Sequence, residues 1–268
     1  MKVLVTGSKG FIGQNLCQAL SKLDWDVVTF DIVDEPKARP KDLSIQDYDW
    51  VIHLGAISST TETDVQKIMD LNLSWSIELL EECITHDVNM QFASSASVYG
   101  KRHKKHGPFK ETDTCMPLNY YAMSKYLFEE YVEKRNYSIT VQGFRYFNVY
   151  GPNEEHKGSQ ASPYTQFIKQ AKESGVIKIF EGSEKCLRDF IHVDDIVSTH
   201  VKMINRKSGI YNIGSGRVRS FLDVARDVAL MFNARIEVVP FPEHLKAHYQ
   251  YYTQADLNNL DTVLSNGL

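Results

Sequence analysis

The sequence has few cysteines, and none of them form a close pair. Its four cysteines lie far apart, and no two stand in a CxxC motif, the spacing typical of zinc sites and redox-active pairs. We therefore expect no metal site and no disulfide. The expected state is free thiols in a reducing compartment, at Cys17, Cys83, Cys115 and Cys186.

The chain also lacks an excess of either charge. Thirty lysines and arginines stand against 34 aspartates and glutamates, which leaves a net charge of −4. Such a balance provides no attraction to nucleic acid or to an anionic membrane surface. Glycine interrupts the opening stretch MKVLVTGSKGFIG, so it reads neither as a signal peptide nor as a membrane span. We expect a cytoplasmic protein with no nucleic-acid or membrane partner.

Long apolar runs are absent too, but short ones alternate with amphipathic segments. Nearly continuous β-rich runs predict strands covered on both faces of a parallel sheet, at residues 2–6, 26–31, 50–56, 90–95 and 139–149. Helical patterns lie between most of them, at residues 11–23, 64–86 and 119–135. This alternation predicts an α/β fold with a doubly wound parallel sheet.

The regular alternation is interrupted in two places. Residues 34–49 contain two prolines and are too short for a full crossover helix, so we expect at most one strand-like piece and a turn. After residue 150 the pattern loosens, with a helix at 164–174, a strand at 176–180 and a further helix that starts at Ser220. Asp223 follows that serine by three residues, which resembles a capping box.

A glycine-rich turn joins the first strand to the first helix. In GSKGFIG, glycine allows a tight turn, close approach of a pyrophosphate to the backbone, and packing of the helix on the sheet; the glycines are Gly7, Gly10 and Gly13. Asp31 ends the second strand, where a carboxylate accepts the ribose hydroxyls of NAD and repels a 2′-phosphate. Lys37 and Arg39 follow closely and could bind such a phosphate, so NADP stays an alternative cofactor. The turn predicts a Rossmann fold that binds NAD or NADP.

Other segments of the same half are expected to contact the dinucleotide. The ends of later strands supply adenine and phosphate contacts in this fold. With the residues of the turn, the expected cofactor set is Phe11, Ile12, Ile32, Asp42, Leu43, Leu54, Gly55 and Ala56. We expect residues 1–150 to form the dinucleotide-binding domain and residues 151–268 to form a smaller α/β substrate-binding cap. A strand and a helix near 188–216 are expected to return to the first domain.

A tyrosine and a lysine stand four residues apart in YYAMSK, on a predicted helix. At this spacing Tyr121 and Lys125 share one helix face, and an ammonium close to a phenol lowers the phenol pKa toward neutrality. Such a tyrosine exchanges a proton with a substrate hydroxyl while hydride moves to nicotinamide. The preceding stretch SSASVYG places Ser95 or Ser97 at a strand end, where a hydroxyl reaches the reacting oxygen.

The motifs GSKGFIG, SSASVYG, YYAMSK and FNVYGP resemble those of the extended short-chain dehydrogenase/reductase family, the NAD-dependent epimerases and dehydratases. Within it, GFRYFNVYGPNEEHKGSQAS and YTQADLNNL are similar to the ADP-glycero-manno-heptose 6-epimerases. The resemblance implies a nucleotide-sugar substrate, a homo-oligomer, and transient oxidation of carbon-6 to a ketone. It also implies a second proton-handling group at Lys157 and a cofactor contact at Asn72. The implied substrate residues are Ser95, Asn148, Ser159, Gln166, Phe180, Glu181, Gly182, Ser183, Arg188 and Tyr249.

The chain departs from this family at two informative positions. Gln166 stands where the family has a substrate-contacting histidine, and Ile32 replaces an asparagine that follows the acidic residue. The second change removes a possible donor to a 2′-phosphate and favours NAD slightly. Arg188 suits a pyrophosphate, with an ion pair to Asp189 or Asp194 as the alternative.

Three alternatives to an epimerase remain. A dehydratase needs an added Asp-Glu acid/base pair beside the active-site hydroxyl. This chain has Ala96 and Ser97 there, which argues against dehydration. A plain reductase would consume external NAD(P)H. A non-catalytic dinucleotide sensor would keep the glycine turn but would not need Tyr121.

The basic loop 101–111 contains His103 and His106, but no further ligand stands beside them, so we interpret it as a solvated or lid-like loop.

Overall fold

The computed structural model describes residues 1–60, 62–101, 107–242 and 250–266. Its main feature is a six-stranded parallel sheet with the strand order β2-β1-β3-β4-β5-β9. The strands are β1 (Lys2–Thr6), β2 (Asp26–Phe30), β3 (Trp50–His53), β4 (Asn89–Ser95), β5 (Val141–Tyr146) and β9 (Gly209–Ile213). The sheet confirms the predicted doubly wound α/β fold.

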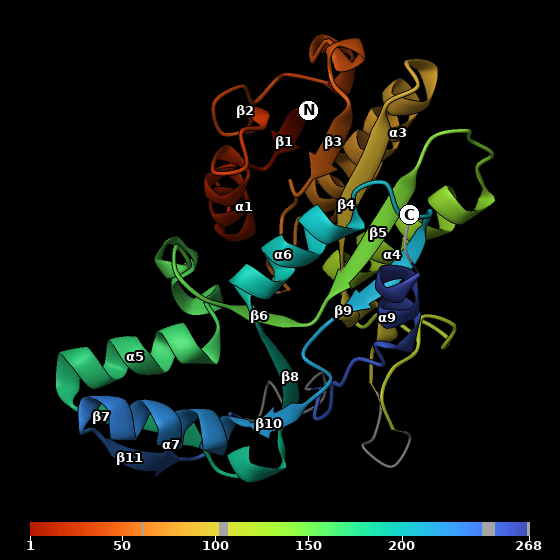
Figure 1. Cartoon of the computed structure of the whole chain (residues 1–268). Helices are drawn as coiled ribbons and strands as arrows, with labels where there is room; N and C mark the ends of the chain where they lie inside the picture. The colour runs from red at the N-terminus through yellow and green to blue at the C-terminus, as the bar shows by residue number, and fades with distance from the viewer. Residues whose placement is uncertain (61, 102–106, 243–249, 267–268) are drawn as a thin grey trace.

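Helices cover both faces of this sheet, as Figure 1 shows. Side chains alternate between the two faces along each strand. Val3 and Val5 of β1 pack with α1 (Phe11–Ser21) and α6 (Val193–Met203). Leu4, between them, packs in the opposite core with α3 (Trp75–Thr85) and α4 (Tyr120–Lys134). The near-continuous apolar runs in the sequence thus reflect strands that are buried on both faces.

The strand β2 forms one edge of the sheet. Residues 34–49 form two 3₁₀ turns, η1 (Pro40–Asp42) and η2 (Ile45–Asp47), and these residues contain no strand. The expected turn is present, and the strand-like piece, of which at most one was expected, is absent from these residues. Prolines at both ends of residues 36–40 favour turns over a ladder strand, because proline has no N–H to donate.

The helical stretch predicted at 64–86 is interrupted. It consists of α2 (Val65–Ile68), a π-helix η3 (Met69–Ser74) and α3. A π-helix carries one extra residue per turn and often occurs at functional sites. Here it places Asn72 inside the protein, where the side chain is fully buried.

A second layer lies beyond the carboxyl ends of the main strands, in the lower part of Figure 1. It contains a three-stranded sheet of β6 (Asn148–Tyr150), β8 (Leu187–His192) and β10 (Val218–Ser220), and a two-stranded sheet of β7 (Val176–Phe180) and β11 (Arg235–Val239). The helices α5 (Pro163–Ser174) and α7 (Phe221–Phe232) pack on the second of these sheets, around a small core that includes Phe167, Ile177 and Val224.

The chain returns from this layer to the main sheet. The helix α6 packs beside α1, and β9 pairs with β5. The short helix α9 (Asn258–Ser265) then covers β9, with Leu260 and Val263 in the core. The capping box at the start of α7 is confirmed, because Asp223 N donates to Ser220 Oγ and Ser220 N donates to Asp223 Oδ2, both at 3.0 Å. The exact division into two domains at residue 150 stays a prediction.

All four cysteines are free thiols. In the described part of the chain, no helix is both long and apolar enough to cross a membrane. The same residues contain no cluster of three histidine, cysteine, aspartate or glutamate side chains that could hold a metal ion.

Candidate active site

The glycine turn brings the backbone of β1, α1 and β3 into close contact. Gly7 has φ of +71°, and a Cβ atom built on it would lie 2.4 Å from the Gly55 nitrogen. A Cβ atom on Gly13 would lie 2.2 Å from the Gly7 oxygen. Only glycine fits these two positions. Gly10 precedes α1 without a side-chain cap, and the first turn of α1 has no acidic residue. The exposed N–H groups there suit an anionic ligand.

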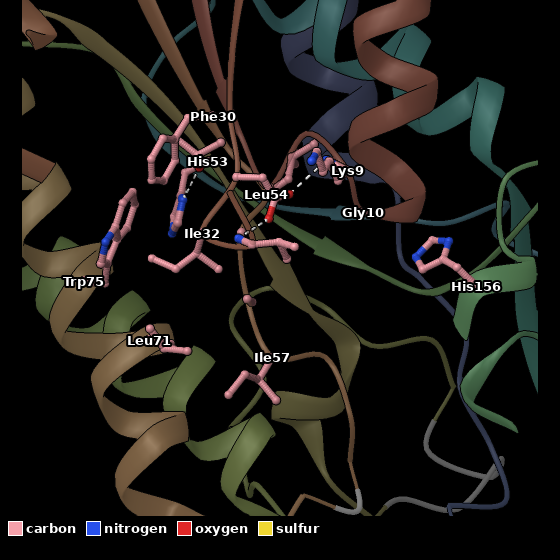
Figure 2. A pocket seen from close by; sticks show the side chains of 16 residues that line it. Lys9, Gly10, Phe30, Ile32, His53, Leu54, Ile57, Leu71, Trp75 and His156 are labelled. Carbon is pink, nitrogen blue, oxygen red and sulfur yellow. Dashed lines mark hydrogen bonds between the residues drawn. The ribbon is translucent and has the colours of Figure 1, made fainter. Parts of the chain in front are cut away.

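A cavity of about 300 Å³ opens in front of this turn. Its lining includes the glycine turn, the end of β2 and the segment after β3 (Figure 2). Seven of the predicted cofactor residues line it: Gly7, Gly10, Asp31, Ile32, Leu54, Gly55 and Ala56. The Asp31 carboxylate accepts hydrogen bonds from the backbone N–H of Lys9 at 2.9 Å and of Val33 at 3.1 Å. The cavity thus has a glycine turn that suits a phosphate and a carboxylate that suits a ribose next to each other.

The other side of this cavity is apolar and contains a neutral histidine. Phe30 and His53 both stack on Trp75, and their ring centroids lie 5.8 and 5.3 Å, respectively, from that of Trp75. His53 Nδ1 lies 2.6 Å from the Thr6 hydroxyl, and Nε2 lies 2.8 Å from the Ser76 hydroxyl. Burial, with a smaller effect of the Lys125 charge, lowers the pKa of His53 to about 3. This flat, uncharged wall suits an aromatic base.

Several predicted cofactor residues do not line this cavity. Phe11, Ile12 and Gly13 lie in the first turn of α1, with Phe11 and Gly13 buried. Asp42 is exposed and accepts a hydrogen bond from Arg39 N at 2.9 Å, and Leu43 packs against the core. The structure does not bring Asp42 or Leu43 to the cavity, because the two 3₁₀ turns direct them elsewhere.

Asn72 hydrogen-bonds to the backbone of a residue that lines the cavity. Its Oδ1 accepts from Ile57 N at 2.7 Å, and its Nδ2 donates to Ile57 O at 3.0 Å and to Ser124 Oγ at 3.1 Å. Ile57 itself lines the cavity. The asparagine amide is therefore used to fix the loop after β3 against α4.

Arg39 is engaged by acidic side chains on the neighbouring helix. Its guanidinium pairs with Glu78, with Nε 2.9 Å from Oε2, and with Asp70 at 3.2 Å. The hydrogen bond to Glu78 is the largest cause of the raised pKa of Arg39, and Asp70 adds a smaller effect. The guanidinium is thus held by α3 and by the π-helix before it.

A second, larger cavity of about 800 Å³ lies between the main sheet and the cap layer. Ser95, Ser97 and Tyr121 are on its wall. Ser95 hydrogen-bonds to Tyr121. The Ser95 hydroxyl also accepts from Ser97 Oγ at 2.9 Å and from Ser97 N at 3.2 Å. The tyrosine and serine predicted for proton transfer therefore meet at one point of this cavity.

Lys125 lies behind the tyrosine and is almost fully buried. Its Nζ donates to Ala93 O at 2.8 Å. Burial lowers the pKa of Lys125 to about 8, against the opposite effect of Glu129. Burial raises the pKa of Tyr121, and the hydrogen bond with Ser95 offsets part of this. The expected lowering of the tyrosine pKa by Lys125 is therefore not found, because the ammonium is directed to a β4 carbonyl.

Most of the predicted substrate residues line the larger cavity. They are Ser95, Asn148, Ser159, Gln166, Phe180, Ser183 and Arg188. Glu181 and Gly182 form the turn before Ser183: Glu181 N donates to Val239 O at 2.8 Å, and Gly182 has φ of +81°. Gln166 ties down the neighbouring loop, since its Nε2 donates to Ala161 O at 2.7 Å and to Ser159 O at 3.1 Å. Tyr249, His103 and His106 lie outside the described residues.

Arg188 places a buried cation at the cavity. It is 6% exposed, and its guanidinium carbon lies 5.7 Å from the centre of the Phe221 ring. The carboxylate of Asp189 accepts hydrogen bonds from other groups, namely Ser215 N and Oγ, Gly216 N and Ala255 N. Asp194 lies 3.3 Å from His192 Nδ1. The Arg188 guanidinium itself donates to Leu187 O at 3.2 Å.

Lys157 lies at a different place from Tyr121. It is not among the described residues that line the larger cavity. Its Nζ lies 3.9 Å from Glu154 Oε1 and 5.6 Å from the centre of the Phe11 ring, at the start of α1. Burial lowers the pKa of Lys157, and Glu154 acts in the opposite direction. The lysine thus has the environment of a proton-transfer group but is directed toward the glycine turn.

Sequence analysis missed a buried tyrosine at the larger cavity. Tyr146 lines it, and its hydroxyl lies 2.5 Å from Nε2 of the fully buried His200. The Nδ1 of this histidine lies 2.7 Å from Gln91 Oε1, which can only accept. Burial lowers the pKa of His200 to about 3, so the neutral ring accepts from the tyrosine. The stretch FRYFNVYGP contained the signal, but no residue pattern pairs Tyr146 with a histidine 54 positions away.

Comparison with known proteins identifies the family. The family model described as "NAD dependent epimerase/dehydratase family" matches residues 3–214. The chain belongs to this family. It is therefore an enzyme of the NAD-dependent epimerase/dehydratase kind, and the two cavities are its candidate active site.

Solved structures of several family members resemble the whole chain. The ADP-L-glycero-D-manno-heptose-6-epimerase of Helicobacter pylori is 27% identical, with a TM-score of 0.86, over 98% of this chain and 90% of that chain. The UDP-glucose 4-epimerase of Thermus thermophilus, in complex with NAD, is 25% identical, with a TM-score of 0.85, over 98% and 92%. The UDP-glucuronic acid 4-epimerase of Bacillus cereus is 27% identical, with a TM-score of 0.82, over 100% and 94%.

Proposed function

We propose that this member of the epimerase/dehydratase family is an NAD-dependent nucleotide-sugar epimerase, and that it inverts carbon-6 of ADP-glycero-manno-heptose. The observation that carries the epimerase proposal is the meeting of Ser95 and Tyr121 at a cavity of about 800 Å³ whose opposite layer contributes the buried Arg188. This arrangement supports a sugar hydroxyl at the tyrosine and a diphosphate at the arginine.

The smaller cavity fits a dinucleotide, and NAD better than NADP. Gly7 and Gly13 allow close backbone contacts around the turn that any Cβ atom would block. Asp31 supports NAD, because a carboxylate repels a 2′-phosphate. Arg39, the arginine placed to compensate, is occupied by Glu78 and Asp70. We assign residues 1–150, with the returning α6 and β9, to dinucleotide binding, and most of residues 151–268 to substrate binding.

The residues of the chain handle the proton of the reacting hydroxyl. Gly7, Gly10 and Asp31 would hold a bound NAD, which would supply the acceptor for the carbon-6 hydride and its return. Tyr121 takes the hydroxyl proton as the ketone forms and gives it back when the carbonyl is reduced, so no net redox change results. Ser95 holds the reacting oxygen, and buried Lys125 packs behind the tyrosine, where its Nζ donates to Ala93 O. Rotation about the carbon-5–carbon-6 bond presents the second face of the ketone.

Lys157 is proposed as the second proton-handling group. Its partly buried ammonium, with a lowered pKa, suits proton donation. Ser159, two residues further along the same segment, already lines the larger cavity. Rotation of the long lysine side chain away from Phe11 would bring the ammonium toward that cavity. If Tyr121 alone serves both faces, Lys157→Ala will retain most of its activity.

Substrate binding is assigned to the cap side of the larger cavity. Arg188 would hold the pyrophosphate in its planar fork. Phe180 and Phe241, with ring centroids 5.3 Å apart, offer a surface for the base. Asn148, Ser159 and Ser183 provide polar groups for the sugar and ribose, with Glu181 and Gly182 shaping the turn and Tyr249 as a further contact.

We also propose a cytoplasmic homo-oligomer. The free thiols support a reducing compartment. Tyr120, Met123 and Leu127 form one stripe along α4 and are 51%, 36% and 37% exposed. A second copy of the chain would cover this stripe. Light scattering of the purified protein will report the mass of the assembly.

The heptose assignment rests on the sequence motifs and on the resemblance to the Helicobacter pylori enzyme, while two UDP-sugar 4-epimerases are similarly related. The test is proton NMR of the NAD-loaded protein with ADP-D-glycero-β-D-manno-heptose, UDP-glucose and UDP-glucuronic acid in separate tubes. We expect the L-glycero epimer from the first tube alone. Conversion of only a UDP-sugar would refute the heptose assignment, and conversion of none would refute the epimerase proposal for these sugars.

A further inference from the structure

One wall residue of the dinucleotide cavity comes from outside the dinucleotide-binding half. The described lining residues otherwise lie between positions 6 and 75, but His156 also lines the cavity. Figure 2 shows its imidazole on the side of the glycine turn, beside Gly10 and far from Trp75. The histidine is exposed, so its ring is accessible to a ligand. This position is at the phosphate end of the cavity, away from the apolar wall.

The segment that carries His156, residues 152–165, is anchored to the first turns of α1. Asn15, buried in that helix, donates from Nδ2 to Pro152 O at 2.9 Å. Asn153 in turn donates from Nδ2 to Asn15 Oδ1 at 3.2 Å. These side-chain bonds fix the start of the segment relative to the glycine turn.

A buried carboxylate fixes the other end of the segment. Glu154 is 1% exposed, and its carboxylate accepts from Ser162 N at 2.7 Å, Ser162 Oγ at 2.6 Å and Thr165 Oγ1 at 2.7 Å. Lys157 N donates to Glu154 O at 3.0 Å. His156 therefore lies on a turn closed at both ends, which limits the positions open to its ring.

We propose that His156 is a cofactor-binding residue contributed by the cap, and that its imidazole donates a hydrogen bond to the diphosphate of the bound dinucleotide. The N–H groups at the start of α1 would hold that diphosphate from one side, and His156 would close the other side. Glu154 is then a positioning residue for His156. The inference rests on the proposed use of NAD.

The test is isothermal titration of NAD into nucleotide-free wild-type protein, His156→Ala, His156→Asn and Glu154→Gln. A lost hydrogen bond to a charged group weakens binding by about tenfold or more. We expect such a loss for His156→Ala, partial rescue in His156→Asn, which keeps a donor, and a smaller loss for Glu154→Gln. His86→Ala is the matched control, since His86 on α3 pairs with Glu82 and lines neither cavity; its NAD affinity should equal that of the wild type.

Adenosine, followed by ligand-observed NMR, separates the diphosphate contact from general damage. It should bind all variants equally, because it lacks the diphosphate. Equal NAD affinity of His156→Ala and wild type would overturn the inference and leave the proposed function intact. A Glu154→Gln protein that loses adenosine as well would overturn the positioning role. A wild-type protein that binds neither NAD nor NADP would overturn the proposed function itself, and this inference with it.

Discussion

Replacing Lys125 by methionine should stabilise the protein at neutral pH. The ammonium is 4% exposed, and its pKa falls from an ordinary 10.5 to about 8 on folding. Since each pH unit between these values corresponds to about 1.4 kcal/mol, folding with a charged Lys125 costs about 3 kcal/mol at pH 7. Methionine fills a similar volume without a charge.

The loss of one hydrogen bond opposes this gain. Lys125 Nζ donates to Ala93 O at 2.8 Å, and a hydrogen bond from a charged donor contributes about 1.5–3 kcal/mol. The net effect of Lys125→Met at pH 7 is therefore a stabilisation of about 1 kcal/mol. For a chain of this length that corresponds to a rise in melting temperature of about 2–4 °C.

The pH dependence gives the sign of the effect. A lysine with a lowered folded-state pKa binds fewer protons in the folded state, so its cost is complete below about pH 8 and fades as the pH rises toward 10.5. At pH 10 only about 1 kcal/mol of the cost remains. The folded-state lysine is then neutral, so the lost hydrogen bond contributes only about 0.5–1.5 kcal/mol and offsets the remaining cost. Lys125→Met should then be about as stable as the wild type.

Urea unfolding of both proteins at pH 7 and pH 10 measures these differences directly. Lys134→Met is the control, because Lys134 is exposed on the same helix and pairs with Glu130 at 2.6 Å; its stability relative to wild type should not change sign. A Lys125→Met protein that is equally destabilised at both pH values would refute the reasoning, since it would show that the buried ammonium carries no desolvation cost.

Three further predictions concern the site. Tyr121→Phe should reduce turnover by at least about a thousandfold, with NAD affinity and melting temperature unchanged; residual turnover near that of wild type would remove the tyrosine from proton transfer. Gly7→Ala should abolish NAD binding in a titration, because its Cβ would clash with Gly55 N at 2.4 Å; an NAD affinity equal to that of the wild type would contradict the role of this turn. Arg188→Lys should raise KM for the nucleotide sugar by about tenfold and leave kcat nearly unchanged, whereas an unchanged KM would exclude a bidentate pyrophosphate contact.

Local patterns predicted the parts of the site that depend on neighbours in the chain. The turn with Gly7, Gly10 and Gly13 stands between one strand and one helix, so its geometry follows from a few residues. Tyr121 and Lys125 share a helix face for the same reason. The carboxyl ends of parallel strands meet at one edge, and this brought Ser95 to Tyr121 as expected.

Contacts between distant segments could not be predicted in the same way. The carbonyl of Ala93, 32 residues away, directs the Lys125 ammonium away from the tyrosine. Asn72 was expected at the cofactor, but a π-helix turns it toward the backbone of Ile57. The position of Lys157 depends on Glu154, which is held by Ser162 and Thr165, and no residue spacing encodes that arrangement.

The most direct test of the central claim is the fate of the hydrogen on the reacting carbon. ADP-D-glycero-β-D-manno-heptose with deuterium at carbon-6 is incubated with the NAD-loaded protein in ordinary water, and the product is examined by proton NMR and mass spectrometry. Transient oxidation and return of the same hydride predict an L-glycero product that keeps its deuterium at carbon-6, with no accumulation of reduced cofactor. A product in which solvent hydrogen has replaced that deuterium, or a stoichiometric build-up of NADH, would contradict the account.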